Sequence, residues 1–353
     1  MDNKQMATSV PSFKEQILRA KAESTTIRVR GGGTKDFYGV SLDGDILDTR
    51  AHSGITEYEP TELVLTAKCG TPLRDIESAL DANNQMLAFE PPHFGEGATF
   101  GGCISSGFSG PRRATQGAVR DFVLGILLMN DNGSELQFGG KVMKNVAGFD
   151  VSRLICGSFG TLGLILEASV KVLPKPEFET TIVFELNKEQ AIERMNDYAA
   201  MPIPLSASCF HDGLLSIRLS GSETAVKSGL KKIGGELTDG TDFWRSIREQ
   251  THSFFQSDQK LFRHSVNSKS PVTHENTLIE WNGSLRWIWS DTTLQEQQDE
   301  AIKCNGNAIL FRNNDRNDAI QTLTDGLMTL QKKVKNSIDP DGVFGKRRLF
   351  TEF

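Results

Sequence analysis

The order of apolar and polar residues predicts a first half built from short strands and helices. Residues 26–30 alternate in polarity and should form a strand that runs straight into glycines. Leu73, Ile76 and Leu80 have helical spacing, so a helix is expected after Thr71-Pro72, which should cap it. Residues 121–129 are almost wholly apolar, as in a strand buried on both faces. Further expected elements are a helix from the capping box at Ser12, strands over 45–49, 62–68, 135–138 and 163–173, and a helix capped by Asp150.

The pattern changes after Pro174-Lys175-Pro176, which we interpret as a domain boundary. Beyond it, strands interleave with helices, and Asn282-Gly283 is a strong hairpin signal. This mixture predicts an α+β domain with a largely antiparallel sheet. We therefore expect domains at 1–176 and 177–337, with a tail over 338–353 that packs back onto the first. The expected strands are 180–186, 206–210, 214–219, 277–281, 284–289 and 307–312, and the helices begin near 187, 222, 242, 293 and 317.

Two stretches are poor in side chains. One is Gly31-Gly32-Gly33-Thr34, and the other, about 65 residues further along, is 98–107. A Walker loop is excluded because no Gly-Lys-Ser or Gly-Lys-Thr follows, and the Gly-x-Gly-x-x-Gly pattern of a Rossmann fold is missing. Exposed amides and small hydroxyl groups suit a diphosphate held between the two loops. The alternative is two tightly packed loops with a purely structural role.

Composition narrows the class of protein. The hydrophobic content of 38% and charged content of 24% are those of an ordinary globular chain, and 353 residues suffice for two domains. A net charge of -6 argues against general nucleic-acid binding. No apolar run reaches the ~20 residues of a membrane span. The five scattered cysteines predict a reducing, cytoplasmic setting without disulfides, zinc or iron–sulfur ligands.

Several motifs together resemble one family of flavoproteins. Arg30 to Thr34 with Gly39, then 98–107, then Gly117 and Asp121 are similar to the PCMH-type FAD-binding domain of the vanillyl-alcohol oxidase family. The blocks at 144–150 and 157–165 follow in the same order. Residues 109–113, 144–150 and 219–221 resemble most the FAD-binding subunits of bacterial glycolate oxidases.

The resemblance implies a fold and a cofactor site. FAD would lie between two α+β subdomains, beneath an α+β cap domain with an antiparallel sheet. The binding would be non-covalent, since Cys103 is more readily interpreted as a buried thiol and His93 as structural. The implied contacts are Arg30, Gly31, Gly32, Gly33, Thr34, Lys35, Gly39, Ala98, Thr99, Gly101, Gly102, Ser105, Ser106, Gly107, Gly117, Asp121, Gly163 and Ile165.

The resemblance also implies an activity, namely oxidation of glycolate to glyoxylate with hydride transfer to FAD. Electrons would pass to a second flavoprotein subunit and an iron–sulfur subunit, and the chain would be cytoplasmic, or peripheral at the inner membrane through these partners. The alternatives are a self-sufficient 2-hydroxyacid dehydrogenase, or a flavin-bearing scaffold without turnover.

The sequence leaves open the roles of several histidine, cationic and tryptophan residues. The histidine-rich cap motif of related dehydrogenases is missing, so we predict no metal site and assign no catalytic base; the sister subunit would hold the main dehydrogenase site. Lys144 and Arg153 are candidate cations near the flavin, with solvated surface charge as the alternative. Arg112-Arg113 could bind phosphate, a substrate carboxylate or a partner protein. Trp281, Trp287 and Trp289 could be core or a cofactor-facing wall.

Overall fold

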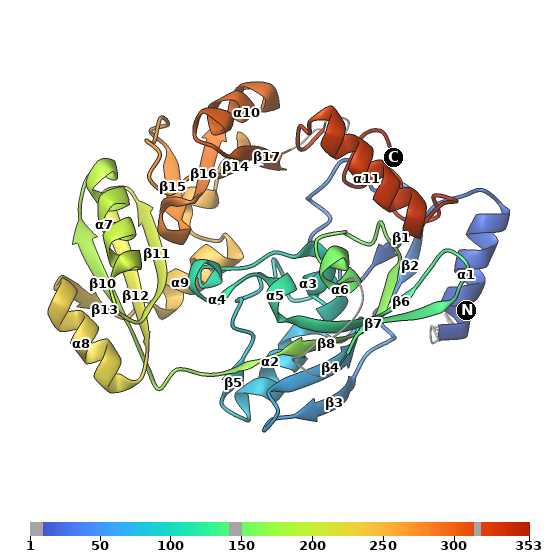
Figure 1. Cartoon of the computed structure of the whole chain (residues 1–353), viewed down its shortest axis with the longest axis horizontal. Coiled ribbons are helices and arrows are strands. Elements are labelled where there is room, and N and C mark those ends of the chain that lie inside the picture. The colour runs from blue at the N-terminus through green and yellow to red at the C-terminus, as the bar shows by residue number, and fades with distance from the viewer. Residues whose placement is uncertain (1–9, 141–149, 314–318) are drawn as a thin grey trace, which may run out of the picture.

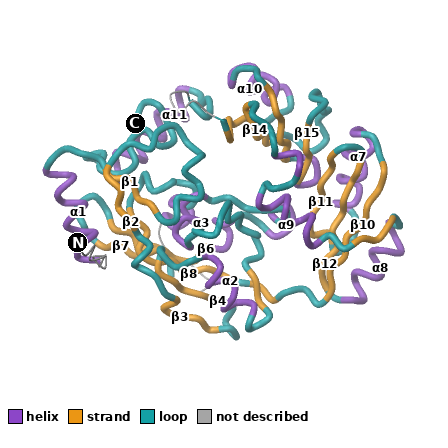
Figure 2. Tube along the Cα trace, turned by 180° about the vertical axis from the view of Figure 1, so that it is seen from behind, coloured by secondary structure: helices purple, strands orange, loops and turns teal. Residues whose placement is uncertain are grey.

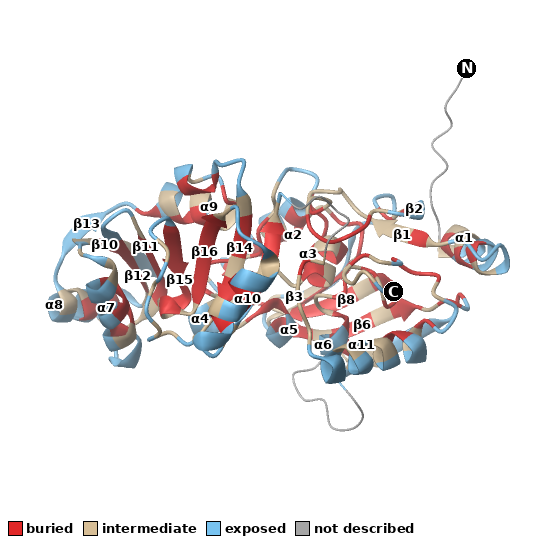
Figure 3. Cartoon of the chain, turned by 90° about the horizontal axis from the view of Figure 1, so that it is seen from above, coloured by how far each residue is buried: buried red, intermediate tan, exposed pale blue. Residues whose placement is uncertain are grey.

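Two sheets, one in each half of the chain, organise the structure (Figure 1). The computed structural model describes residues 10–140, 150–313 and 319–353. The first half holds a five-stranded sheet in the order β3-β4-β8-β6-β7, and the second an eight-stranded sheet in the order β13-β10-β12-β11-β15-β16-β14-β17. Buried strands form the centre of both halves, and their helices turn exposed faces outward (Figure 3).

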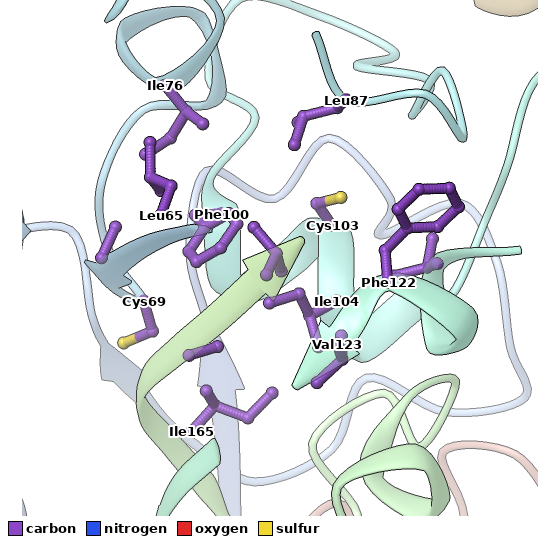
Figure 4. Packing of buried hydrophobic residues seen from close by; sticks show 14 of the residues in the cluster. Leu65, Cys69, Ile76, Leu87, Phe100, Cys103, Ile104, Phe122, Val123 and Ile165 are labelled. Atoms are coloured by element: carbon purple, nitrogen blue, oxygen red, sulfur yellow. The ribbon is translucent and has the colours of Figure 1, made fainter. Parts of the chain in front are cut away.

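The five-stranded sheet is antiparallel throughout. Helices α2 (Leu73–Asp81) and α3 (Phe100–Ser106) pack on it, and the predicted apolar face Leu73, Ile76 and Leu80 is fully buried. Figure 4 shows Phe100, Cys103 and Ile104 of α3 within this core. The strands are β3 (Ile55–Glu59), β4 (Val64–Lys68), β6 (Val123–Met129), β7 (Glu135–Gly139) and β8 (Leu164–Lys171).

A smaller unit carries the first glycine loop. β1 (Ile27–Arg30) pairs in parallel with β2 (Asp45–Asp48), and α1 (Val10–Ala22) packs beside them. The C-terminal tail returns to the same place, because the Ile27 amide donates to the Val343 carbonyl at 2.7 Å. The tail therefore reaches the strand that leads into residues 31–33.

The eight-stranded sheet is antiparallel, as predicted. Helices α7 (Lys188–Ala200) and α8 (Glu223–Ile233) cover one face at its β10–β12 end (Figure 2). The opposite face packs on residues of the first half, including Tyr38 and Val40. The other elements are β10 (Phe178–Glu185), β11 (Leu205–His211), β12 (Leu214–Gly221), β13 (Glu236–Thr238), α9 (Thr241–Glu249), β14 (Lys260–Ser265), β15 (Thr277–Glu280), β16 (Leu285–Ser290), α10 (Leu294–Lys303), β17 (Asn307–Arg312) and α11 (Asp325–Ile338).

Some predicted boundaries in the first half were wrong, each for a local reason. The short helix α5 (Val119–Phe122) precedes β6, because the Asp121 carboxylate accepts from the Ala118 amide at 2.8 Å and closes a turn. Thr71 does not cap α2, since its hydroxyl donates to the Lys68 carbonyl instead. The strand β3 was missed, and Ser12 lies inside α1. The predicted strand 163–173 is split into β8 and β9 (Leu173–Pro174), which pairs with β5 (Gln85–Met86).

In the second half, strands β13 and β14 were missed, and two boundaries differ clearly from the prediction. The hairpin at Asn282-Gly283 is present, but Glu280 pairs with Leu285, so a turn of η2 (Trp281–Gly283) separates the strands. Helix α11 begins at Asp325, because Thr324 accepts from the Leu327 amide and caps it there. The block at 144–149 lies outside the described residues, and its predicted role is untouched by the structure.

Candidate functional site

The first glycine loop faces helix α3 across a cleft of about 920 Å³; the second stretch was predicted as a loop, but residues 100–106 form this helix, capped by the Thr99 side chain. Residues from three distant parts of the chain line the cleft, namely the segment after β1, helix α3 and the C-terminal tail. The lining is Arg28, Val29, Arg30, Gly31, Gly32, Gly33, Thr34, Lys35, Asp36, Ser41, Asp43, Thr49, Cys69, Thr99, Gly101, Gly102, Ser105, Ser106, Phe159, Gly160, Gly163, Ile165, Gly345, Lys346 and Arg348.

The first glycine loop, α3 and the segment at Cys69 can approach one another closely because the glycines at these contacts have no side chain. A methyl group on Gly31 would lie 2.3 Å from the Thr99 hydroxyl oxygen, and one on Gly101 would lie 2.6 Å from the Cβ of Cys69. Gly33 has a φ of +73°, which favours glycine. The Thr99 hydroxyl accepts from the Gly102 amide and fixes the start of α3. Backbone therefore approaches backbone here, and main-chain groups line the cleft.

Positive charge is concentrated in the cleft. Lys35 is 9% exposed and forms no ion pair within the described part of the chain; its ammonium lies 3.3 Å from the His93 carbonyl oxygen. The pKa of Lys35 is lowered, because burial removes water from its ammonium group and no carboxylate pairs with it among the described residues. Arg348, from the tail, donates to the Lys35 carbonyl at 3.2 Å. An anion such as a phosphate would satisfy this lysine.

The loop at 157–163 connects this cleft to a second one. The Phe159 amide donates to the Ser105 carbonyl at 2.8 Å, which holds the loop against α3. Phe159 and Ser106 line both clefts, so the two adjoin. Gly163 and Ile165, at the start of β8, line the first.

The second cleft, of about 950 Å³, lies between the two halves of the chain. Aromatic side chains form much of its wall, and Phe159 stacks on Tyr38 with ring centroids 4.9 Å apart. The lining is Tyr38, Pro92, Phe94, Ser106, Gly107, Phe108, Ser109, Gly110, Pro111, Arg113, Gly157, Phe159, Ile247, Arg248, Gln250, Arg263, Glu280, Trp281, Leu285, Trp287, Phe311, Gln321 and Leu349. Its lining combines these rings with polar side chains such as Gln250 and Gln321 and with four charged residues.

Burial shifts the pKa values of two of the charged groups in this cleft, Glu280 and Arg263. Burial raises the pKa of Glu280 to about 7, although the Trp287 indole N–H donates to its carboxylate at 2.8 Å and opposes the shift. Burial lowers the pKa of Arg263 to about 10. The guanidinium carbons of Arg113 and Arg263 lie 4.4 and 5.1 Å from the ring centroid of Trp281. A carboxyl group whose pKa lies near 7, in a cleft that also contains two arginines, is typical of a reactive site.

Most of the predicted cofactor residues meet at the first cleft. Gly107 lines the second one instead. Gly39, Ala98, Gly117 and Asp121 line neither: Gly39 abuts the Arg348 backbone, and Asp121 is engaged in the cap of α5. The predicted residues that line the first cleft are Arg30, Gly31, Gly32, Gly33, Thr34, Lys35, Thr99, Gly101, Gly102, Ser105, Ser106, Gly163 and Ile165. Their contact with a cofactor remains a prediction.

The two neighbouring arginines have different surroundings. Arg112 is buried and donates to Glu90 at 2.9 Å and to Glu179, so it joins the two halves. Arg113 faces the second cleft. Arg153 is exposed and paired with Asp150 at 3.0 Å.

The tryptophan, cysteine and histidine candidates also differ in their surroundings. Trp281 and Trp287 line the second cleft, whereas the Trp289 indole donates to the Phe254 carbonyl within the core. Cys103 is 1% exposed and burial raises its thiol pKa to about 12, which fits the buried-thiol interpretation. His93 lies 3.0 Å from Glu77. The described residues include no group of three or more His, Cys, Asp or Glu side chains able to hold a metal.

Sequence reasoning missed the residues that reach the clefts from afar. In the first cleft these include Gly345, Lys346 and Arg348 of the tail, which the basic run at 346–348 could have signalled. In the second they include Arg263 and Glu280. The available signal for Glu280 was its position as the one charged residue in the strand Thr277–Glu280.

The chain is similar to known flavoproteins. A family model described as an FAD binding domain matches residues 6–139. The glycolate oxidase subunit GlcE of Escherichia coli (strain K12) is 41% identical over 340 residues, which cover 96% of each protein. The glycolate oxidase subunit GlcD of Bacillus subtilis (strain 168) is 33% identical over 56% of this chain and 43% of that protein. The mitochondrial D-lactate dehydrogenase [cytochrome] 1 of Saccharomyces cerevisiae is 29% identical over 58% of this chain and 34% of that protein.

A solved structure shares the fold. Alkyldihydroxyacetonephosphate synthase superposes with a TM-score of 0.64 at 15% identity, over 94% of this chain and 73% of that one. At this identity the likeness concerns architecture alone. With the family match, it confirms the predicted PCMH-type FAD-binding fold.

Proposed function

The chain belongs to the family of FAD-dependent oxidoreductases that contains the glycolate oxidase subunit GlcE of Escherichia coli, and from this premise we propose that it oxidises a short 2-hydroxyacid, glycolate foremost, as one subunit of a complex. The observation that carries the proposal is the junction of the two clefts at Ser106 and Phe159. The junction connects the first cleft, which is lined by cations, to the second cleft, which contains the Glu280 carboxyl group.

The residues of the first cleft fit FAD. Glycines 31–33 and 101–102 would present backbone to the diphosphate, with Lys35 as its cation. When bound, FAD supplies the acceptor for the two electrons and the hydrogen that leave the substrate carbon. The second cleft would hold the substrate. Residues 1–176 would bind the cofactor, and the tail over 338–353 would pack on this domain. Residues 177–337 would cover the cofactor.

The cofactor should be bound without a covalent bond. Cys69 lines the first cleft, but it is 2% exposed and burial raises the pKa of its thiol to about 12. A protonated, enclosed thiol is a poor nucleophile. Neither cleft is lined by a histidine within the described residues.

Partners would carry the electrons onward. The relatives named as glycolate oxidase subunits support a complex of several subunits. The partners proposed within it are a second flavoprotein subunit and an iron–sulfur subunit. None of the helices in the described part of the chain has the length and apolar character to cross a bilayer. Attachment at the inner membrane would therefore pass through those partners.

The visible spectrum of the purified full chain tests the proposal. We expect flavin absorption that is released into solution on acid precipitation, and anaerobic addition of glycolate should bleach it. Bleaching only after the second flavoprotein subunit is added would assign turnover to the complex and support the scaffold role. A colourless chain that takes up no added FAD would refute the proposal.

A further inference from the structure

The second cleft contains two arginines that lack an anionic partner. Arg113 begins helix α4 (Arg113–Gln116) in the first half, and Arg263 lies on β14 in the second. Neither forms an ion pair within 4 Å or a side-chain hydrogen bond with any residue that the structure describes. Both stack on Trp281, at 4.4 and 5.1 Å from its ring centroid. Two cations from different halves therefore converge on one aromatic ring.

Cations in such a cleft are costly without a counter-charge. Removing a guanidinium from water is unfavourable unless an anion or several acceptors replace the solvent. The walls combine aromatic faces, from Tyr38, Phe108, Trp287 and Phe311 among others, with the polar groups of Gln250, Gln321 and Glu280. Both guanidinium groups are half-buried, so an anionic ligand in the cleft would replace the solvent around them.

We propose that Arg113 and Arg263 bind the carboxylate of a short 2-hydroxy monocarboxylic acid, and that Glu280 accepts the proton of its hydroxyl group. This assignment rests on the proposed function for the identity of the reaction. The carboxylate clamp and the proton acceptor are separate claims and have separate tests.

The charge of the cleft favours a monoanion. Its charged lining residues are Arg113, Arg248, Arg263 and Glu280. Arg248 is neutralised by Glu249, whose carboxylate lies 2.8 Å from its Nε atom. Two guanidinium groups and one ionised Glu280 leave a net charge of one, which a single carboxylate balances. A dicarboxylate would bring a second negative charge into a cleft whose remaining arginine, Arg248, is already paired with Glu249.

Glu280 is placed to act on the group beside that carboxylate. It is the chain neighbour of Trp281, on which both arginines stack, and it lines the same cleft. The Trp287 indole fixes one carboxylate oxygen at 2.8 Å, and no described residue forms a hydrogen bond with the other oxygen. Oxidation of the alcohol breaks the O–H and C–H bonds and forms C=O. Glu280 would take the proton, and bound FAD would supply the acceptor for the carbon-bound hydrogen and its electron pair.

The clamp is tested by binding an unreactive ligand to the oxidised, FAD-loaded full chain. Glyoxylate, the expected product, and malonate, a dianion, are titrated while tryptophan fluorescence is followed, since Trp281 and Trp287 line the cleft. We expect glyoxylate to bind more tightly than malonate. Arg113→Met and Arg263→Met should each raise the glyoxylate Kd about tenfold to a hundredfold. Arg245→Met, an exposed arginine paired with Asp242 on α9, is the matched control and should change nothing.

Binding by both variants within twofold of the unmodified chain would overturn the clamp. If Arg263→Met does not fold, Arg263→Lys and Arg113→Met carry the test, because Arg113 lies on a different element. The fluorescence titration can be read with or without flavin. Failure to bind FAD would therefore count against the proposed function, whereas unchanged glyoxylate binding would count against this inference.

The proton acceptor is tested with Glu280→Gln. The substitution removes a negative charge from an anion site, so glyoxylate should bind as tightly as before or more tightly. Anaerobic reduction of the flavin by glycolate should slow by about a hundredfold to ten-thousandfold. In the unmodified chain that rate should rise with pH up to about 7 and then level off, and this dependence should vanish in Glu280→Gln. An unchanged reduction rate would show that another group takes the proton.

Discussion

A methyl group placed on Gly32 would lie 1.6 Å from the carbonyl oxygen of Gly97. These glycines belong to loops that are distant along the sequence, yet their backbones touch at the mouth of the first cleft. No side chain larger than hydrogen fits at Gly32 without moving one loop from the other. The contact thus fixes the width of the cradle proposed to hold the diphosphate.

Gly32→Ala should therefore abolish FAD binding while much of the fold survives. The clash is with backbone, so relief requires the 31–33 loop to shift away from the turn at Gly97 that precedes α3. Absorbance of the purified chain after incubation with FAD, with circular dichroism to verify folding, measures the effect. Gly326→Ala is the control, since an added methyl group there meets nothing within 4 Å and the residue lies in an exposed part of α11. Full flavin content in Gly32→Ala would contradict the role of the cradle.

Lys35→Met should weaken FAD binding about tenfold to a hundredfold, because a charge-assisted contact with phosphate would be lost. Burial lowers the pKa of Lys35 in the ligand-free chain, and a bound diphosphate would restore its charged form. Titration of the flavin-free chain with FAD measures the change. Lys227→Met, an exposed lysine paired with Glu223 on α8, is the control. Equal affinity for FAD in Lys35→Met and the unmodified chain would remove Lys35 from the site.

The two clefts differ in how far they could be predicted. The first depends on runs of glycine whose meaning is local, so Gly31 to Gly33 and Gly101-Gly102 stand out in the sequence. The second depends on pairing between elements far apart: Arg113 meets Trp281 only because α4 packs beside the β15–β16 hairpin. Periodicity describes each strand but not which strand faces another half of the chain. For this reason the general form of the second sheet was predictable, whereas Glu280 and Arg263 were not.

Glu90→Gln should destabilise the docking of the two halves by about 3 kcal/mol, the usual effect of breaking a buried ion pair. Glu90 lies 2.9 Å from both Arg112 and Arg218, so its loss leaves two buried guanidinium groups short of an anion. Burial alone would raise the pKa of Glu90, but Arg218 and Arg112 outweigh it and the pKa is lowered. The stabilisation is therefore present at neutral pH and is lost as the pH falls through that lowered value.

Urea unfolding of Glu90→Gln at pH 7 and at pH values below the ordinary pKa of 4.5 measures this contribution. The difference from the unmodified chain should shrink as the pH falls, because protonation of Glu90 removes the same charge. Glu275→Gln is the control, since that side chain is 98% exposed beside Lys188 and its ion pair should contribute less than about 1 kcal/mol. A constant difference at all pH values would mean that packing, not charge, accounts for the loss.

Glu280→Gln should stabilise the chain at pH 8 and leave it nearly unchanged at pH 4.5. The folded-state pKa of Glu280 is about 7, above the ordinary 4.5, because burial disfavours its charged form. Its favourable contribution is therefore complete below pH 4.5 and is lost as the pH rises to about 7. A shift from 4.5 to 7 corresponds to about 3 kcal/mol, and glutamine mimics the protonated group. Arg263 and Arg218 lower this pKa and Glu90 raises it, so all three must be intact in the comparison.

Thermal unfolding of the flavin-free chain at the two pH values checks the sign. A higher melting temperature for Glu280→Gln at pH 8, together with slower flavin reduction, would show that a destabilising carboxylate is retained for its chemistry. Lower stability of the variant at pH 8 would mean that Glu280 is ionised and well paired in the fold. In that case its carboxyl group would have an ordinary or lowered pKa, and the rate of flavin reduction should not change near pH 7.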